Sequence, residues 1–552
     1  MWKYKSLLPN KNFILGVCVG IGLCLYVGLY FFQDSFKQPV RKFGKVLKYI
    51  EKYHIDTIDN AKLTELTDAA LAKLAKQLDP HTTYIDAQQN SISKHHLKSH
   101  IEGVGIEFIL LKDVVYVLHV IPKGPADQAG LQAGDKVIKI DEHILKEANF
   151  NSNDIVSKMR GPKGTPVKVS VCRNNTKDLI EVTIIRDQVS IQSIDASYMV
   201  DNQTGYIKLN QFANQTHLEF IEKINQLLEQ GMKKLLLDLR DNSGGYLGTA
   251  LDIAEEMLEP GKLLLYTKGK YKKFDIKHYA NGKNRLHKLP IIVLTNENTA
   301  SASELLAGAL QDHDRALIVG RRSFGKGLVQ WPIEFKDNSV LNLTVERYFT
   351  PSGRFIQKPY DKRINYELDL YNRYKQGEYF HADSIQLDKN LVYQTSAGRT
   401  VYGGGGIMPD HFIPLDTTAH SGYINDLVDH YIIQQYAITY AHSNKQKLEK
   451  MRLEDYLKNF SITEEMVKQI VEEAKNSKIK QVPITNQIKS FIKNLLKAYI
   501  AKTLWQYQGF YSVYNQTDAT ISKSLKLFNQ AEALLQEDIS YIAEKARKNI
   551  KL

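Results

Sequence analysis

The sequence predicts an α/β multidomain chain, and three stretches of its 552 residues carry that prediction. A short apolar run, a turn of small residues and a helix-forming segment follow one another at 235–258 and again at 290–310. Between Gly103 and Arg186 lies a series of short runs typical of β-strands, and from about residue 420 the chain is helical and rich in lysine. We therefore expect an α/β body, a small β domain and helical regions before and after them.

The composition is that of a folded protein, with 43% hydrophobic and 24% charged residues, which excludes wholesale disorder. A net charge of +12 would suit nucleic acid or an anionic membrane surface. The lysines are scattered, however, and form no basic stripe interleaved with aromatic residues. We expect no nucleic-acid partner.

Neither a metal nor a cofactor is expected. The 3 cysteines show neither a disulfide framework nor metal-ligand spacing. His96 and His100 lie one helical turn apart, a spacing that can hold zinc, but no Glu-bearing metalloprotease motif accompanies them. The glycine run at 403–406 lacks the strand–loop–helix context of a cofactor site.

The N-terminal end carries one long apolar run, Phe13–Phe32, after a short tail over residues 1–11. The run is long enough to cross a bilayer as a helix, and no Ala-x-Ala-like cleavage site follows it. We therefore expect an uncleaved membrane anchor over residues 12–33 rather than a removed signal. Basic residues between 37 and 48 outnumber those of the tail, so the positive-inside rule gives no clear orientation.

Residues 34–97 are expected to form two or three amphipathic helices, because apolar side chains recur there at helical spacing. The segment 78–84, Leu-Asp-Pro-His-Thr-Thr-Tyr, lies within this region. Its His81 could be a catalytic base. The neighbouring Pro80 favours a structural turn residue instead.

The β-rich module, over residues 98–188, contains two glycine-bearing signatures: Gly103-Val104-Gly105-Ile106, and a Gly-Pro-Ala…Ala-Gly-Leu…Gly-Asp run at 124–135. The module resembles a PDZ domain. The amides of the first loop can then form a nest for a terminal carboxylate, with Ile106 and a helix over Ser152–Met159 lining a side-chain pocket. Arg160, in the turn after that helix, is a further candidate peptide-binding residue, and the turn resembles one in which the arginine faces the body of the protein. A small β domain that only packs is the alternative.

In the body, over residues 189–419, Ser301 is expected at the mouth of a helix, where backbone N–H groups point outward. Lys326 stands between two glycines, which allow close approach of the backbone, so a buried ammonium could reach that serine. Taken alone, Ser301 and Glu304 also fit a capping box, and Gly325-Lys326-Gly327 also fits a solvated turn.

Two longer motifs change that balance. Thr299-Ala300-Ser301-Ala302-Ser303-Glu304 and Phe324-Gly325-Lys326-Gly327-Leu328-Val329-Gln330 resemble the signatures of the carboxy-terminal processing peptidases, or tail-specific proteases, and segment 78–84 fits a third motif of that family. The resemblance implies a crotonase-like (ββα) serine protease body with Ser301 as nucleophile, Lys326 as base and Gln330 in a supporting polar role. Thr299 stands where the family has serine.

The first glycine turn of the body is the candidate oxyanion hole. Gly244 and Gly245 can aim their amides at a developing oxyanion without a Cβ in the way, and Ala302, which follows the nucleophile, offers a second donor. Glycines needed only for helix–strand packing are the alternative. Val340–Phe349 is expected to be a strand, residues 359–392 are interpreted as an insertion, and residues 420–552 as a helical region for assembly or partners.

The sequence thus predicts a membrane-anchored serine endopeptidase that binds proteins by their free C-termini and forms an acyl-enzyme at Ser301. Only the resemblance places its catalytic part on the periplasmic side of a bacterial-type inner membrane. A homo-oligomer or an adaptor is left open. The alternatives are an inactive membrane-tethered PDZ scaffold and a Ser-His-Asp hydrolase that uses His313 or His81.

Overall fold

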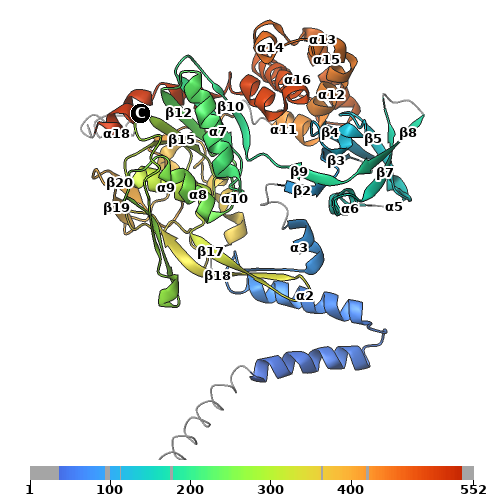
Figure 1. The fold of residues 1–552 in the computed structure, drawn as a ribbon, viewed down its shortest axis with the longest axis horizontal. Helices are drawn as coiled ribbons and strands as arrows, with labels where there is room; N and C mark the ends of the chain where they lie inside the picture. The colour runs from blue at the N-terminus through green and yellow to red at the C-terminus, as the bar shows by residue number, and fades with distance from the viewer. Residues whose placement is uncertain are drawn as a thin grey trace, which may run out of the picture.

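The computed structural model describes residues 37–93, 100–111, 114–148, 150–173, 178–361, 365–417 and 422–536 (Figure 1). The predicted anchor at 12–33 lies outside them. Every helix within these ranges is too short or too polar to cross a bilayer.

The N-terminal region is helical, as expected, and is tied to the body by one short strand. A helix over residues 37–53 and α2 (Asn60–Lys76) extend away from the body, and α3 (Ala87–Ser93) follows (Figure 1). Strand β1 (Thr83–Ile85) pairs antiparallel with β18 (Val340–Phe349). The turn at 78–84 therefore lies against β18, a strand of the body.

The β-rich module folds around a six-stranded sheet in the order β3-β4-β5-β7-β8, with β6 beside β5. Strands β2 and β9 pair at its two ends, where the module joins the chain. Valine and isoleucine side chains of the sheet pack against α6, which has the predicted bounds Ser152–Met159. The other elements are β2 (His100–Gly103), β3 (Ile106–Leu111), β4 (Val114–Val120), α4 (Pro125–Gln128), β5 (Lys136–Ile140), β6 (His143–Ile144), α5 (Leu145–Ala148), β7 (Pro166–Cys172), β8 (Leu179–Ile185) and β9 (Asp187–Ser190).

The body is built on a second six-stranded sheet, ordered β10-β11-β12-β15-β16-β21, in which every pair except β10–β11 is parallel. The predicted strand–turn–helix units are β12 to α8 and β15 to α9. The crotonase-like assignment stays a prediction. The elements are β10 (Ile194–Met199), β11 (Thr204–Leu209), α7 (Thr216–Glu229), β12 (Lys234–Asp238), α8 (Leu247–Glu255), β15 (Ile291–Thr295), α9 (Ala302–Asp312), β16 (Leu317–Gly320) and β21 (His411–Phe412).

Both faces of this sheet are buried, which explains its nearly continuous apolar strands. Leu235 and Leu237 of β12 face the core formed with α7, α8 and α9. Leu236, between them, faces a second core formed with α17 (Ala519–Leu525) and α18 (Phe528–Leu535). The last described helices thus cover one face of the body sheet, so the division predicted at residues 419 and 420 does not follow the packing.

A smaller antiparallel sheet, ordered β1-β18-β13-β14 with β17 beside β18, completes the body. Strand β18 has the predicted bounds. The predicted insertion contains α10 and two single 3-10 turns. The remaining elements are β13 (Leu263–Gly269), η1 (Lys272–Phe274), β14 (Lys277–Tyr279), β17 (Leu328–Glu334), η2 (Tyr366–Leu368), α10 (Asp369–Lys375), η3 (Ala382–Ser384), β19 (Val392–Gln394) and β20 (Thr400–Tyr402).

Helices α11 to α16 form a core of their own and lie beside both the β-rich module and the body (Figure 1). In α16, Lys502 binds Glu107 of β3 at 3.0 Å, and Gln508 exchanges hydrogen bonds with the backbone of Ser197 in β10. The six helices are α11 (Gly422–Asp429), α12 (Ile432–Ser443), α13 (Lys445–Leu448), α14 (Leu453–Asn459), α15 (Glu464–Asn476) and α16 (Asn486–Tyr514).

Candidate active site

Ser301 occupies the sharp turn between β15 and α9, with φ 58° and ψ −117°. A positive φ is uncommon for a residue with a Cβ and costs on the order of 1–3 kcal/mol, so the surroundings must impose it. Ser301 is half-buried, and its neighbours Ala300 and Ala302 are buried. Strained strand-to-helix turns of this kind present nucleophilic serines in other hydrolases.

The fully buried Glu304 carboxylate joins the serine turn to the lysine loop. It accepts backbone hydrogen bonds from Ser301 at 2.8 Å, Gly325 at 2.7 Å and Lys326 at 2.8 Å, and a hydroxyl bond from Ser323 at 2.5 Å. Burial raises the pKa of Glu304, and these donors oppose the rise. The bond to Ser301 is the Glu304 half of the capping box. The other three come from a distant segment, which is why local spacing could not reveal them.

A second buried group, the Tyr348 hydroxyl, lies between the carbonyl oxygens of the same two residues. Its Oη is 3.1 Å from the carbonyl oxygen of Ser301 and 2.6 Å from that of Lys326. Burial holds the pKa of Tyr348 well above its usual value, so the group stays a donor. Ser301 and Lys326 are therefore held together on both sides of the backbone.

Lys326 is half-buried, and desolvation lowers its pKa, although Glu304 and Asp79 oppose this through their charges. Among the residues that the structure describes, no carboxylate oxygen lies within 4.0 Å of its Nζ. No hydrogen bond joins Nζ to the Ser301 hydroxyl either; in the absence of substrate such bonds are often long. The site therefore holds a partly desolvated amine without a direct counter-ion, on a loop whose backbone is joined to the serine turn through Glu304 and Tyr348.

Gln330 belongs to a polar chain that ends near this lysine. Its Nε2 donates to Thr344 Oγ1 at 3.2 Å, and the Thr344 hydroxyl donates to Asp79 at 3.0 Å. Burial works against ionisation of Asp79, but hydrogen bonds from Thr82, His81 and Thr344 hold its pKa below the usual range. The predicted supporting residue thus acts on an anion that stabilises charge on Lys326.

The turn after β12 lies directly against the nucleophile. A Cβ on Gly244 would come within 2.9 Å of Ser301 Cβ, the Ala302 nitrogen and the Ala300 carbonyl, so only glycine fits. The Gly244 N–H already donates to Asn242 Oδ1 at 2.9 Å. Within the described part of the chain, the N–H groups of Gly245 and Ala302 donate to no protein acceptor. These two remain the candidate oxyanion donors.

The two histidines proposed for the rival triad lie in different surroundings, and distance excludes only His313. His313 follows the C-terminal end of α9, and a rise of about 1.5 Å per residue puts it roughly 16–18 Å from Ser301. His81 shares a hydrogen bond with Tyr366 at 2.9 Å, and burial together with the charge of Lys326 lowers its pKa to about 4. His81 is thus a neutral residue beside the lysine, with its Nε2 bonded to Tyr366.

In the β-rich module, the predicted carboxylate loop adjoins the open edge of the sheet. Val104 is buried, Gly105 has φ 78°, and Ile106 begins β3, which pairs with β4 alone among the described strands. Arg160 lies beside Gly103 through an isolated backbone bridge. Its predicted orientation toward the body stays a prediction.

Across the described ranges, no group of three or more histidine, cysteine, aspartate or glutamate side chains is arranged to hold a metal ion. His100 starts strand β2, and His96 lies outside the described residues. A cavity of about 1640 Å³ opens between the turn at 78–81 and the insertion, lined in part by Phe324 and Phe355. It provides space for a peptide beside the lysine loop.

Comparison with known proteins matches three separate stretches of the chain. Models of Peptidase family S41 and of the PDZ domain match residues 203–365 and 103–184, and a family of unknown function matches residues 423–506. The carboxy-terminal-processing protease of Bartonella bacilliformis is 34% identical over 329 residues, which are 59% of this chain and 74% of that protein. The carboxy-terminal processing protease CtpA of Bacillus subtilis is 31% identical over 59% of this chain and 69% of its own.

The solved structure of a photosystem II D1 C-terminal processing protease is 28% identical, with a TM-score of 0.32 over 56% of this chain and 82% of its own. A PDZ module joined to an S41 body defines the class of this protein, a serine-type peptidase with a PDZ domain. Within that class, the chain belongs to the carboxy-terminal processing protease family.

Proposed function

We propose that this protein is a serine endopeptidase in which Ser301 attacks the scissile carbonyl and Lys326 accepts the hydroxyl proton. The observation that carries the proposal is the pair of buried groups, Glu304 and Tyr348, which hold these two residues together while Lys326 has no direct counter-ion. Lys326 passes this proton to the leaving amine as the peptide bond breaks. Water then attacks the acyl-enzyme, and Lys326 accepts a proton from the water and returns it to the Ser301 oxygen.

The chemistry requires a neutral lysine. An unperturbed lysine is neutral only about once in 2,500 at pH 7, so desolvation must lower the pKa by ~3 units, equivalent to about 4 kcal/mol. Burial of Lys326 acts in that direction. Gly245 and Ala302 would stabilise the oxyanion through their N–H groups, which have no protein acceptor in the described residues.

Substrates would be recognised by their free C-termini at the PDZ module. A chain ending in small or apolar residues would add as a strand to the open edge of β3, with its carboxylate on the amides of loop 103–106. We further propose that residues 12–33 anchor the protein and that its body lies on the periplasmic side of a bacterial-type inner membrane. A homo-oligomer or an adaptor is compatible with this function.

The dyad is tested by Ser301→Ala, which should abolish peptide cleavage in a folded protein. Ser303→Ala is the matched control two residues away. Its hydroxyl donates to the Asn242 carbonyl at 2.9 Å, so we expect reduced but substantial cleavage. Cleavage by Ser301→Ala at the parent rate would reject the dyad. If cleavage were lost only in Ser303→Ala, Ser303 and not Ser301 would be the nucleophile.

C-terminal recognition is tested by one peptide prepared as the free acid and as the amide. The amide should be cleaved at least tenfold more slowly, because it lacks the charge that the loop binds. Equal rates would show that the module does not bind the carboxylate. The anchor and its orientation are tested by adding protease to osmotically opened cells. The body should be digested while cytoplasmic markers survive. If the body is protected instead, it lies on the cytoplasmic side.

A further inference from the structure

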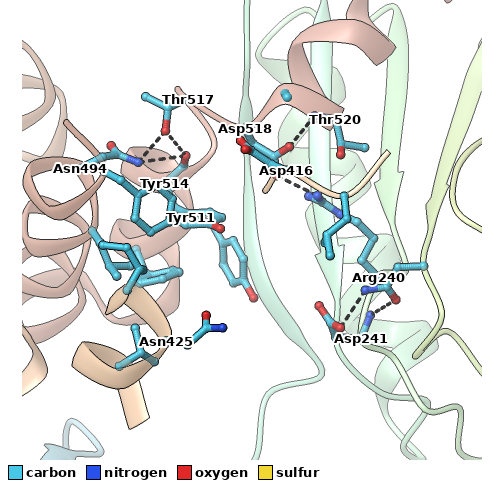
Figure 2. A pocket seen from close by; sticks show the side chains of 18 of the residues that line it. Arg240, Asp241, Asp416, Asn425, Asn494, Tyr511, Tyr514, Thr517, Asp518 and Thr520 are labelled. Atoms are coloured by element: carbon cyan, nitrogen blue, oxygen red, sulfur yellow. Dashed lines mark hydrogen bonds and ion pairs between the residues drawn. The ribbon is translucent and has the colours of Figure 1, made fainter. Parts of the chain in front are cut away.

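An ion pair connects the last part of the described chain to the turn that faces the nucleophile. Figure 2 shows Asp518, just before α17, beside Arg240, which follows β12, at the edge of a cavity of about 690 Å³. Asp518 Oδ2 lies 2.7 Å from Arg240 Nη1, and both side chains are largely buried, 8% and 16% exposed. Because both groups are buried, removing one of them leaves the charge of the other without compensation.

Arg240 is the centre of a small buried charge cluster. Its Nε and Nη2 bind the carboxylate of Asp238, which is fully buried and also accepts the Tyr206 hydroxyl at 2.8 Å. Lys208 lies 3.7 Å from the same carboxylate and donates to the Arg240 carbonyl oxygen. The cluster holds two anions, Asp238 and Asp518, and two cations, so removing the charge of Asp518 leaves one positive charge uncompensated.

The backbone that follows Arg240 is bonded directly to the nucleophile turn. The Asn242 carbonyl oxygen accepts the Ala300 N–H at 3.0 Å and the Ser303 hydroxyl at 2.9 Å. Two residues further, Gly244 is in contact with Ser301. A shift of Arg240 would thus displace the backbone that binds Ala300 and Ser303, on either side of the nucleophile. It would also displace the candidate oxyanion donor Gly245.

We propose that Asp518 is a positioning residue for catalysis, which fixes the oxyanion turn at 240–245 through Arg240 and so makes the C-terminal helices part of the active site. The inference rests on the proposed acyl transfer at Ser301. It assigns to α17 a role that its apolar packing on the body sheet alone would not give it.

The side chain of Asp518 allows a selective test because its two carboxylate oxygens bind different partners. Oδ1 caps α17 by accepting the N–H groups of Thr520 at 2.7 Å and Ile521 at 3.2 Å, while Oδ2 binds Arg240. Asp518→Asn can keep the cap through its amide oxygen and removes only the charge. Asp455→Asn is the matched control, because its partner Arg452 is exposed and both residues lie in the same helical region, away from the body.

The measurement is kcat and KM on one free-acid peptide, with rates divided by the fraction of enzyme that is folded. Asp518→Asn should lower kcat by about tenfold or more with KM within about twofold of the parent, because a charge-assisted bond is lost behind the oxyanion turn. Asp455→Asn should match the parent. If Asp518 acts through Arg240, adding Asp518→Asn to Arg240→Met should cause little further loss.

Parental kcat in folded Asp518→Asn would overturn the proposal, as would losses that multiply in the double variant. A variant that does not fold under any assay condition would also overturn it, since Asp518 would then act on the whole fold. Ser301→Ala in the same assay separates the two ideas. If Ser301→Ala still cleaves, the proposed dyad has failed; if it is inactive and Asp518→Asn is unaffected, only the positioning role has failed.

Discussion

Two lysines of the body lie on neighbouring loops, the half-buried Lys326 and the buried Lys358, and their partners differ. Lys358 Nζ lies 2.9 Å from Asp369 and packs 3.7 Å and 4.3 Å from the ring centroids of Phe324 and Tyr366. Lys326 has no carboxylate within 4.0 Å among the described residues. Burial lowers the pKa of both, but Asp369 opposes this directly at Lys358.

The comparison shows how one residue type can serve two purposes in one part of the fold. A counter-ion and two aromatic faces keep the Lys358 ammonium charged and fix the insertion to the lysine loop. A desolvated lysine without them is costly to charge, which is the property that a general base requires. The absence of a direct counter-ion is therefore what favours Lys326 over Lys358 as the proposed base.

The largest expected effect is on activity when each lysine is replaced by arginine. Lys326→Arg should lose at least about 1,000-fold in kcat/KM, as much as Lys326→Ala, because arginine cannot give up its proton and general bases contribute about 10²–10⁴-fold. Lys358→Arg should keep most activity because its charge is retained. The measurement is kcat/KM of both variants on the same peptide. An active Lys326→Arg would exclude Lys326 as the base.

The pH dependence should identify the group that titrates. Because burial lowers the pKa of Lys326 from 10.5, kcat/KM should rise with pH through that lowered value and level off below pH 10.5. His81, with a pKa of about 4, cannot produce this rise. The profile of His81→Asn is the control; if the rise disappears in that variant, the histidine and not the lysine is the titrating group.

Stability should change in opposite directions when each lysine is replaced by methionine. Lys326→Met should raise the free energy of unfolding by about 1 kcal/mol, because a buried amine without a direct counter-ion is removed. Lys358→Met should lower it by about 1–3 kcal/mol, since Asp369 loses its partner. Denaturant unfolding of both variants measures this, and a shift of the same sign in both would contradict the contrast.

The pH dependence of stability provides the control for that prediction. Between the lowered pKa of folded Lys326 and 10.5, the unfolded chain binds more protons than the folded one. The free energy of unfolding should therefore rise with pH in this window. Lys326→Met should reduce the rise, and the part that remains includes Lys358, whose pKa is also lowered by burial.

The smallest expected effect concerns the polar chain near Lys326. Gln330→Ala removes a donor to Thr344 at 3.2 Å and lies two steps from Asp79, so the Asp79 anion should be slightly less stabilised and the rise of kcat/KM with pH should move to lower pH by less than about one unit. Thr344→Val removes the hydroxyl that donates to Asp79 and should move the rise further. An unchanged pH profile in Thr344→Val would show that the chain does not tune the lysine.

Features confined to one local segment could be predicted from the sequence. The bounds of α6 and β18, the two strand–turn–helix units and the position of Ser301 at a helix mouth follow from periodicity and turn residues. Contacts between distant segments could not be predicted. Glu304 accepts from residues 323–326, Tyr348 bonds to Ser301 and Lys326, and Asp518 binds Arg240. Neither spacing nor propensity specifies such pairs.

The covering of the body sheet by α17 and α18 has a consequence for the timing of biosynthesis. These helices come far after Ser301 in the chain, and until they emerge one face of the sheet around Leu236 and Ile292 stays bare. At about 5–20 residues per second, the serine precedes them by on the order of ten seconds or more. A body built this way completes its sheet only after α18 has been made, so Ser301 is synthesised well before the sheet beside it is covered on both faces.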